Sequence, residues 1–577
     1  MTDEPTRLVK RATGIQGLDG VTRGGLPQGG ATLVIGQPGC GKTVLGLQIL
    51  ARAAERGEGG VMVSFEESRA QVHRDAGSFS WGAALQGSTN CEIVDARRTA
   101  GAEVSGPFDI DGLLAAVGAC VERVNATWVV LDGIDQLLRL QPDNQVAVDQ
   151  VVQINQWCEA RGLTMVITGK STQSHPASPD YLAGIEFMLS TVIVLSTQLV
   201  QQRLTRRLRI AKYRGTGHVT DEIPLVIDGD GVHLPHDTIT DPGTAPALAE
   251  RVGTGVARLN EVLGGGVYRG SATLISGQPG TAKTTFAAAF AEAAAARGER
   301  VLYISFDEFA AQIVRNVGTV GIDLQQHIDS GQLMVHARAA WTSLVEEHFL
   351  DVLRLMDSFQ PEFLVVDPAS ALLKASNAES AFQALEQLVA RTRHDGITTV
   401  LTSLTESDDP VGETTLSHTS TLADNWIVLR YAVHGGERNR ALSVVKSRGT
   451  PHSNQVREVL MSPRGVDLAD VFQYGSEVLM GTARLQKESQ ESAAQRHHDR
   501  ERAERQRDLK RRLEQARTEA RQATDEVEHL LEAMEYEEAL AASSQQDASA
   551  HQERVRRRRA PHQADPGTGR DHGEDDQ

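Results

Sequence analysis

The sequence has 577 residues, which exceeds what one hydrophobic core supports, so we expect two domains of about 230 residues each and an extension. A formal net charge of −18 with only 4% aromatic residues argues against a general nucleic-acid binder, which needs a basic face and rings that stack on bases. The four cysteines lack metal-ligand spacing and the chain shows neither a secretory signal nor an apolar membrane span, so we expect a soluble protein of the reducing cytoplasm.

The first half begins with the elements of a phosphate-binding loop. An apolar β-branched run at 31–35 predicts a strand, and the spacing of apolar residues in 45–54 predicts a helix. Between them, the stretch from Gly36 to Thr43 reads GQPGCGKT and fits the pattern GxxxxGK[ST] in full. In such a loop, backbone N–H groups surround the β-phosphate, the lysine reaches the β- and γ-phosphate oxygens and the threonine binds Mg²⁺. We therefore predict that Lys42 and Thr43 bind ATP and Mg²⁺.

Acidic residues follow two further strands of this half. A strand at 60–65 is followed directly by Glu66 and Glu67, and the apolar strand at 128–132 ends in Asp132. Ligands of open α/β sheets bind at the carboxyl ends of the strands. We predict that the glutamates polarise an attacking water or hydroxyl and that Asp132 belongs to the outer shell of the metal.

The second half repeats this arrangement after a His-, Asp-, Thr- and Pro-rich linker at 236–249. Its loop, GQPGTAKT, ends in Lys283 and Thr284 and departs from the pattern only at Ala282. An acid pair, Asp307 and Glu308, recurs at the same offset as the loop, and Asp367 ends a matching strand. We predict the same roles for these residues, with Asp307 as a further Mg²⁺ ligand.

The order of these motifs resembles the KaiC family of RecA-like clock ATPases and autokinases. The resemblance covers about residues 10–480 and includes two Lys-x-Arg-Gly elements, KYRGTGH at 212–218 and KSRGTPH at 446–452. It implies an α/β fold with two tandem RecA-like P-loop NTPase domains, at 1–235 and 250–480, each a mostly parallel sheet flanked by helices.

The resemblance also implies a homohexamer of two stacked rings. In that arrangement, Lys212 and Arg214 complete the nucleotide site of the neighbouring subunit in the first ring, and Lys446, Arg448 and Arg440 do so in the second. The cations then neutralise γ-phosphate charge only when the ring is assembled. The implied nucleotide-binding residues are Gly39, Cys40, Gly41, Lys42, Thr43, Val44, Ser78, Asp132, Lys212, Tyr213, Arg214, Thr216 and His218 in the first domain, and Thr281, Ala282, Lys283, Thr284, Thr285, Asp367, Arg440, Lys446, Ser447 and Arg448 in the second.

One element occurs only in the second half. The stretch TLSHTSTLAD at 415–424 is similar to the phosphorylation segment of the family, which makes Ser420 and Thr421 the acceptors and Thr415 a transient acceptor. The resemblance thus implies an ATPase and serine/threonine autokinase with a timing or signalling role, and a KaiB-like partner on the first domain. Because Ala282 brings a methyl group near the phosphates and Asp307 shortens the proposed base, we expect hydrolysis foremost in the first domain.

Beyond residue 480 the resemblance ends. Apolar side chains step alternately by four and three through a charged sequence, at Leu509, Leu513, Ala516, Ala520, Ala523, Val527, Leu530 and Met534. This spacing predicts a coiled-coil helix over 481–545 that pairs two rings, and the composition of 546–577 predicts a disordered tail. A single solvated helix is the alternative.

Two other functions remain open from the sequence. A RecA-like DNA-dependent ATPase of the recombination, repair or helicase type would use the Arg-rich tail against DNA, although the acidic balance and scarce aromatic residues oppose it. A scaffold in which ATP only holds the ring together would need no kinase activity.

Overall fold

The computed structural model describes residues 8–97, 110–138, 144–170, 183–200, 202–235, 248–374, 377–405, 419–434, 436–474 and 477–557. Thr415, most of the predicted linker and residues 558–577 lie outside these ranges. The chain divides into two units, Met1–Gly481 and Thr482–Gln577.

Within the described part of the first half, nine strands form one sheet. Their order across the sheet is β11 (Gly231–His233), β10 (Ile223–Asp228), β9 (Arg203–Tyr213), β8 (Thr191–Val200), β3 (Gly30–Gly36), β7 (Thr164–Lys170), β6 (Ala126–Asp132), β4 (Gly59–Ser64) and β5 (Cys91–Asp95). The strands from β8 to β5 in this order are parallel, and β9, β10 and β11 continue the sheet antiparallel. The parallel register places the carboxyl ends of β3, β4, β6 and β7 at one edge.

The described residues of the second half form an equivalent sheet. Its order is β16 (Leu333–Ala337), β15 (Val301–Ser305), β17 (Phe363–Asp367), β18 (Thr398–Leu404), β14 (Ala272–Gly277), β19 (Asn425–His434), β20 (Glu437–Ser447), β21 (Arg457–Ser462) and β22 (Gly465–Asp470). Strands β16 to β19 are parallel and the last three are antiparallel. The predicted fold of two tandem RecA-like domains, each a mostly parallel sheet, is confirmed.

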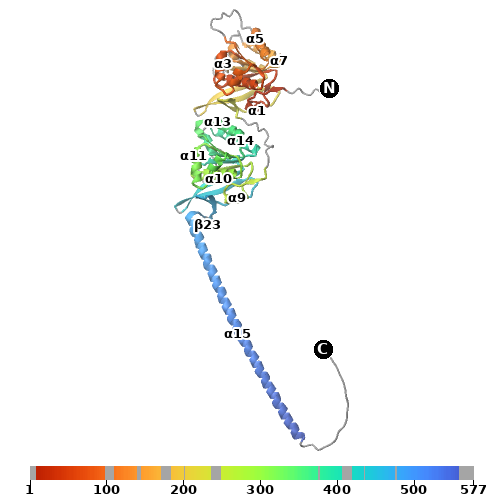
Figure 1. Ribbon diagram of the computed structural model, residues 1–577, viewed down its shortest axis with the longest axis vertical. Helices are drawn as coiled ribbons and strands as arrows, with labels where there is room; N and C mark the ends of the chain where they lie inside the picture. The colour runs from red at the N-terminus through yellow and green to blue at the C-terminus, as the bar shows by residue number, and fades with distance from the viewer. Residues whose placement is uncertain are drawn as a thin grey trace, which may run out of the picture. The chain divides into compact units, whose positions relative to one another are not determined.

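Helices cover both faces of each sheet (Figure 1). In the first half, α1 (Gln16–Val21), α2 (Lys42–Glu55), α3 (Arg69–Ala76) and α4 (Gly82–Gly87) share one core, and α5 (Ile110–Val124), α6 (Ile134–Leu138), α7 (Asn144–Ala160) and α8 (Ala183–Met188) share the other. In the second half, the corresponding groups are α9 (Ala257–Val262), α10 (Lys283–Ala296), α11 (Ala310–Gly318) and α12 (Gln325–Asp329), and α13 (Val345–Phe359) and α14 (Ala378–His394).

The central strands between these helices are mostly apolar because their side chains alternate between two buried faces. Val34, for example, belongs to the core under α2, whereas its neighbour Leu33 belongs to the core under α5 and α7. Shorter elements complete the domains: β1 (Lys10–Arg11), β2 (Leu26–Pro27), β12 (Arg251–Val252), β13 (Val267–Tyr268), β23 (Phe472–Tyr474), β24 (Glu477–Leu479), η2 (Ala340–Thr342), η3 (Ala369–Lys374) and η4 (Thr419–Thr421).

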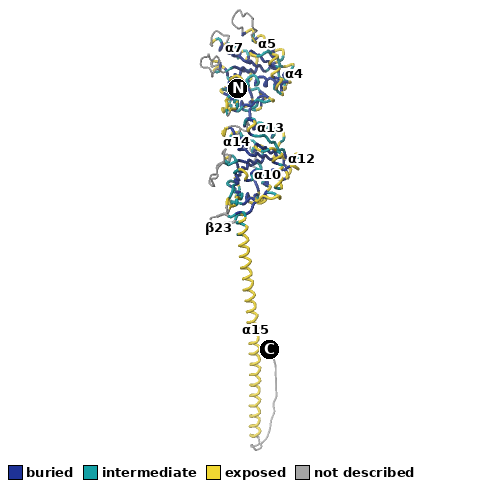
Figure 2. The backbone as a smooth tube through the Cα atoms, turned by 90° about the vertical axis from the view of Figure 1, so that its left-hand side faces the viewer, coloured by how far each residue is buried: buried dark blue, intermediate teal, exposed yellow. Residues whose placement is uncertain are grey.

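The last helix, α15 (Gly481–Arg557), begins where the sequence predicts it and is exposed from residue 488 to 556 (Figure 2). It continues past 545, so residues 546–557 are helical where we predicted a disordered tail. This stretch is rich in Ala, Gln, Glu and Arg, which favour helix, and it contains no Gly or Pro to end one. Leu509 and Leu513 of the predicted seam are 63% and 54% exposed in the single chain, so the coiled coil stays a prediction. The described helices include none that is long and apolar enough to cross a membrane.

Candidate active site

The loop between β3 and α2 has a backbone that glycine favours. Gly39 and Gly41 have φ angles of 78° and 103°, in the left-handed region. A Cβ atom at Gly41 would lie only 2.5 Å from Ile227 Cδ1, so this position also lacks room for a side chain. Lys42 Nζ donates to the carbonyl oxygens of Gly36 and Gln37, both at 2.9 Å, which holds the ammonium inside the loop. A cavity of about 440 Å³ lies beside this loop.

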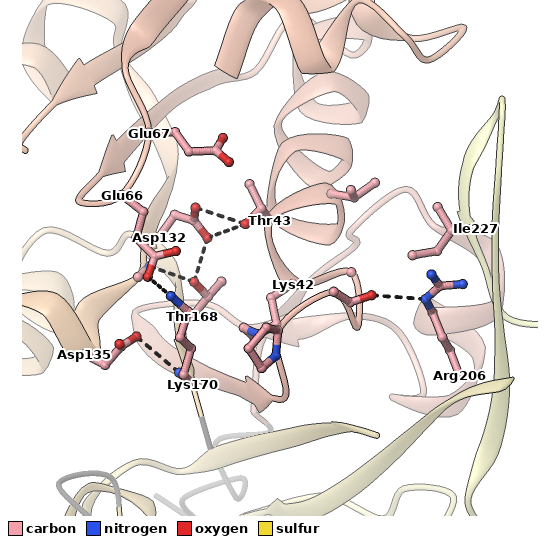
Figure 3. Close-up of a pocket in the computed structure, with 15 residues that line it drawn as sticks. Lys42, Thr43, Glu66, Glu67, Asp132, Asp135, Thr168, Lys170, Arg206 and Ile227 are labelled. Atoms are coloured by element: carbon pink, nitrogen blue, oxygen red, sulfur yellow. Dashed lines mark hydrogen bonds and ion pairs between the residues drawn. The ribbon is translucent and has the colours of Figure 1, made fainter. Parts of the chain in front are cut away.

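Asp132, at the end of β6, connects the loop to the neighbouring strands. Its carboxylate accepts hydrogen bonds from Thr43 Oγ1, at 3.1 Å to each oxygen, and from Thr168 Oγ1 at 2.7 Å (Figure 3). Burial raises the pKa of Asp132, and the hydrogen bonds from Thr168 and Thr43 offset part of that rise. The predicted threonine ligand and the outer-shell carboxylate are therefore in contact.

The two glutamates that follow β4 both line the cavity but differ in their surroundings. Burial would raise the pKa of Glu66, but hydrogen bonds from Lys170 and Gln136 and the charges of Lys170 and Lys42 lower it overall. The pKa of Glu67 is raised, by burial and by the negative charges of Asp75, Asp132 and Glu66. Glu66 is thus held ionised, whereas Glu67 is the more basic carboxylate of the pair.

These residues fit a nucleoside triphosphate with Mg²⁺. The left-handed glycines leave space in which phosphate oxygens meet backbone N–H groups, and Lys42 supplies a cation at the base of the loop. Thr43 and Asp132 supply the oxygen donors that Mg²⁺ prefers. The described residues hold no cluster of three or more His, Cys, Asp or Glu side chains arranged for another metal.

The second loop keeps this geometry with a strained residue. Ala282 has φ 81° and ψ 25°, which an L-residue with a Cβ rarely adopts. Lys283 Nζ donates to the carbonyl oxygens of Gly277 and Gln278 at 2.9 and 2.8 Å, as Lys42 does in the first loop. Burial lowers the pKa of Lys283 to about 8, against the opposing charge of Asp367.

The acids of the second site keep one partner of the first site, because Thr402 of β18 corresponds to Thr168 of β7, and differ in the others. Asp367 accepts hydrogen bonds from Tyr303 Oη, at 2.7 Å, and from Thr402 Oγ1. Glu308 Oε2 accepts from Asn316 Nδ2 at 3.1 Å, at the position where Asp75 faces Glu67 in the first site. An amide that donates to Glu308 replaces a carboxylate that repels Glu67, so the two sites surround their acids with different charges.

The Lys-x-Arg-Gly elements lie away from the loops of their own domains. Lys212 of β9 pairs with Val192, near the start of β8. The loop follows Gly36 at the end of β3, and Gly36 pairs with Leu195, further along β8. Lys212 Nζ and Arg214 Nη2 donate to backbone oxygens of α8, including that of Phe187, at 2.9 and 3.2 Å. In the second domain, Lys446 pairs with Trp426 at the start of β19.

The predicted phosphoacceptors lie at the same end of the second sheet. Ser420 and Thr421 belong to η4, just before β19, and Thr421 is exposed while Ser420 is half-buried. Lys446 Nζ donates to Ser420 O at 3.4 Å and to Ala423 O at 2.7 Å. The structure therefore brings the acceptor segment and Lys446 together, three residues along β19 from Leu429, which pairs with Gly277 at the start of the second loop.

Comparison with known proteins identifies the family. The family model described as "ATPase: KaiC" matches residues 11–238 and 252–472. This chain belongs to the KaiC family. It is similar to the "Circadian clock protein KaiC2" of Synechocystis sp., with 35% identity over 85% of this chain and 87% of that protein. It is 30% identical to the KaiC3 protein of the same organism over 84% and 96%, and to the "Circadian clock oscillator protein KaiC" of Synechococcus elongatus over 83% and 92%. The two repeats are thus KaiC-type ATPase domains.

Several residues that the KaiC resemblance predicts to bind nucleotide contact other parts of the protein in the structure. Tyr213 Oη donates to Gly25 O at 2.7 Å, and Ser447 Oγ donates to Asn425 Oδ1 at 2.8 Å. The remaining positions are of three kinds. Cys40 and Thr281 are buried within their loops, Ser78 is exposed after α3, and Val44, Thr216, His218, Thr285 and Arg448 are half-buried or exposed. Nucleotide contact by all of these residues stays a prediction.

Sequence reasoning missed five polar residues at the first KaiC-type site: Asp135, Gln136, Thr168, Lys170 and Arg206. Arg206 Nε donates to Gly39 O at 3.3 Å, as Arg440 Nε does to Gly280 O at 3.0 Å in the second domain. Both arginines thus contact the loop of their own domain. The repeat could have predicted Arg206, because it lies six residues before Lys212, as Arg440 lies six residues before Lys446. Lys170 gave no such signal, because Leu404 occupies its position in the second domain.

Proposed function

We propose that this KaiC-family ATPase assembles into a homohexamer of two stacked rings, hydrolyses ATP in the first ring and phosphorylates Ser420 and Thr421 in the second. In this proposal the phosphorylated state is a timing or signalling output. The names of the relatives, which describe circadian clock proteins, support the timing role. Mg²⁺ and ATP are the proposed ligands of both sites.

The observation that carries the proposal is the placement of the cations and acceptors. Lys212, Lys446 and Ser420 lie toward the amino-terminal ends of β8 and β19, whereas the loops follow the carboxyl ends of β3 and β14. A chain that uses these groups for phosphate chemistry has to present them to another copy. A closed ring provides each site with one such neighbour.

In the first ring, hydrolysis uses the two glutamates at the end of β4. Bound Mg-ATP supplies an electrophilic γ-phosphorus and neutralises part of the charge that develops on it. Glu67, the more basic carboxylate, accepts the proton of the attacking water while the water oxygen bonds to phosphorus and the bond to ADP breaks. Lys42 and the neighbour's Lys212 and Arg214 stabilise the charge on the leaving oxygens.

In the second ring, a hydroxyl replaces the water. The oxygen of Ser420 or Thr421 forms the new bond to the γ-phosphorus, and the bond to the β-phosphate oxygen of ADP breaks. The proton of the hydroxyl passes to the acid pair Asp307 and Glu308 of the neighbouring subunit. Transfer needs the acceptor in line with the leaving oxygen, so it depends on ring assembly.

The exposed apolar positions of α15 support self-association through this helix. Leu509, Leu513, Leu530 and Met534 are all more than half exposed in the single chain, and six copies per ring would raise their effective concentration. We propose that these helices pair two rings as a coiled coil.

The experiment that tests the proposal is native mass measurement with and without ATP, followed by a phosphopeptide map after incubation with Mg-ATP. A hexamer with phosphate on Ser420 or Thr421 is expected. Unmodified protein whose hydrolysis DNA stimulates would point to a nucleic-acid motor. Assembly with ATP but negligible turnover would point to a scaffold.

A further inference from the structure

Three groups hold the carboxylate of Glu66 in the first site. Lys170, at the end of β7, forms an ion pair with Oε1, and Gln136 Nε2 donates to the same oxygen at 3.2 Å. The side chain also packs over Gly133, where an added Cβ atom would lie 2.7 Å from Glu66 Cγ. These contacts come from β7, α6 and the turn after β6, so Glu66 is fixed from three directions. Figure 3 shows the contact between Glu66 and Lys170.

The second site has different residues at all three positions. The register of β7 on β3 places Lys170 opposite Gly36, and the register of β18 on β14 places Leu404 opposite Gly277. Strands β6 and β17 end in Asp132 and Asp367, so Pro368 and Ala371 correspond to Gly133 and Gln136. The amide, the cation and the small residue around Glu66 thus belong to the first domain alone among the described residues of these two sites.

We propose that Lys170 is a positioning residue that fixes Glu66 for water attack and thereby assigns hydrolysis to the first domain. The inference deepens the proposed function and rests on hydrolysis taking place at the first site.

Charge explains why a cation is needed at this position. Glu66, Glu67 and Asp132 lie together around one cavity, and each carboxylate repels the others. Lys170 attracts Glu66 away from this repulsion and selects one side-chain orientation, which Gln136 and Gly133 then complete. A glutamate with one orientation holds an attacking water in line, and loss of that alignment costs rate rather than affinity.

The first test separates positioning from nucleotide binding. In full-length protein carrying Lys283→Ala, so that turnover reports the first site, Lys170→Met should lower kcat about tenfold with KM within about twofold. Lys170→Arg should restore kcat to within about threefold, because the pair uses a single oxygen of Glu66 rather than a two-pronged contact. Arg161→Met, an exposed cation before β7, is the matched control and should leave kcat unchanged.

A double-mutant cycle tests whether Lys170 acts through Glu66. In a Glu66→Gln background, Lys170→Met should change kcat by less than about twofold, because the group that it positions is already lost. A tenfold loss in that background, or an unchanged or higher kcat for Lys170→Met alone, would overturn the proposal.

A second readout needs neither nucleotide nor turnover. In a crystal structure of the nucleotide-free Lys170→Met protein, the Glu66 carboxylate should leave its place over Gly133; a carboxylate that stays there would contradict the role of Lys170. A different result would contradict the proposed function itself, namely intact hydrolysis in Lys42→Ala. Loss of hydrolysis in Lys42→Ala with full activity in Lys170→Met would refute only the positioning role.

Discussion

Replacing Ala282 with glycine should stabilise the second domain. Ala282 has φ 81° and ψ 25°, and a left-handed L-residue costs roughly 1–2 kcal/mol. Glycine removes that cost. However, glycine also gives the unfolded chain more conformational freedom, which lowers the free energy of unfolding by about 0.4–1 kcal/mol. The net gain is about 1 kcal/mol, which corresponds to a rise of about 2–4 °C in the unfolding midpoint of a domain of this size.

The reciprocal change in the first domain provides the control. Gly41→Ala introduces the same backbone strain at φ 103° and places a methyl group 2.5 Å from Ile227 Cδ1. We expect a loss of about 2 kcal/mol, since the contact adds to the strain. Scanning calorimetry of the nucleotide-free protein measures the midpoints, and hydrogen exchange of α2 and α10 assigns each change to its domain. A lower midpoint for Ala282→Gly, or no loss for Gly41→Ala, would refute the reasoning.

Four further outcomes follow from the sites, the buried histidines and α15. Lys42→Ala should lower hydrolysis about a hundredfold and weaken the hexamer, as a phosphate-release assay and native mass measurement would show; unchanged turnover contradicts the site. Glu66→Gln should slow hydrolysis, because the side chain keeps its shape but loses its negative charge. The affinity for a non-hydrolysable ATP analogue, measured by calorimetry, should stay within about twofold. A large loss of affinity would make Glu66 a binding residue. Burial lowers the pKa of His233 and His348 below the unfolded value of 6.5, so both histidines bind protons more readily when unfolded. The unfolding midpoint should therefore fall as pH drops below about 6.5, and His348→Gln should flatten this dependence; equal slopes for the two proteins exclude His348 as a source. Leu513→Glu should reduce pairing of rings in sedimentation experiments while hydrolysis is unchanged; undiminished pairing would show that this seam position is not in the contact.

The fold could be predicted because its signals are local and occur twice. A β-branched run, a glycine-rich loop and a periodic helix identify β3, the first loop and α2, and the same order recurs at β14 and α10. The boundary of α15 was less predictable, since 546–557 is polar enough for a disordered tail yet contains good helix formers.

The site was predictable only where the repeat or a motif marked it. Lys42, Thr43 and Asp132 lie together as the motif predicts. Lys170 lies at the end of β7 and Gln136 in α6, and Leu404 and Ala371 occupy their positions in the second half, so only the folded register brings them to Glu66. Tyr303 likewise reaches Asp367 from a neighbouring strand, at a position that reads as an ordinary core residue.

Strand β9 carries two cations at different positions along its length. Arg206 contacts the loop of its own domain, and Lys212 lies six residues further along the same strand. At about 3.4 Å per residue the strand spans about 20 Å between them, and β20 repeats this spacing from Arg440 to Lys446. A β-strand stretches very little. If Lys212 reaches the nucleotide site of the neighbouring subunit, as proposed, the length of β9 sets the distance between consecutive sites. In the proposed ring, a movement of β9 at one nucleotide site would therefore move Lys212 at the neighbouring site, which would couple the two sites mechanically.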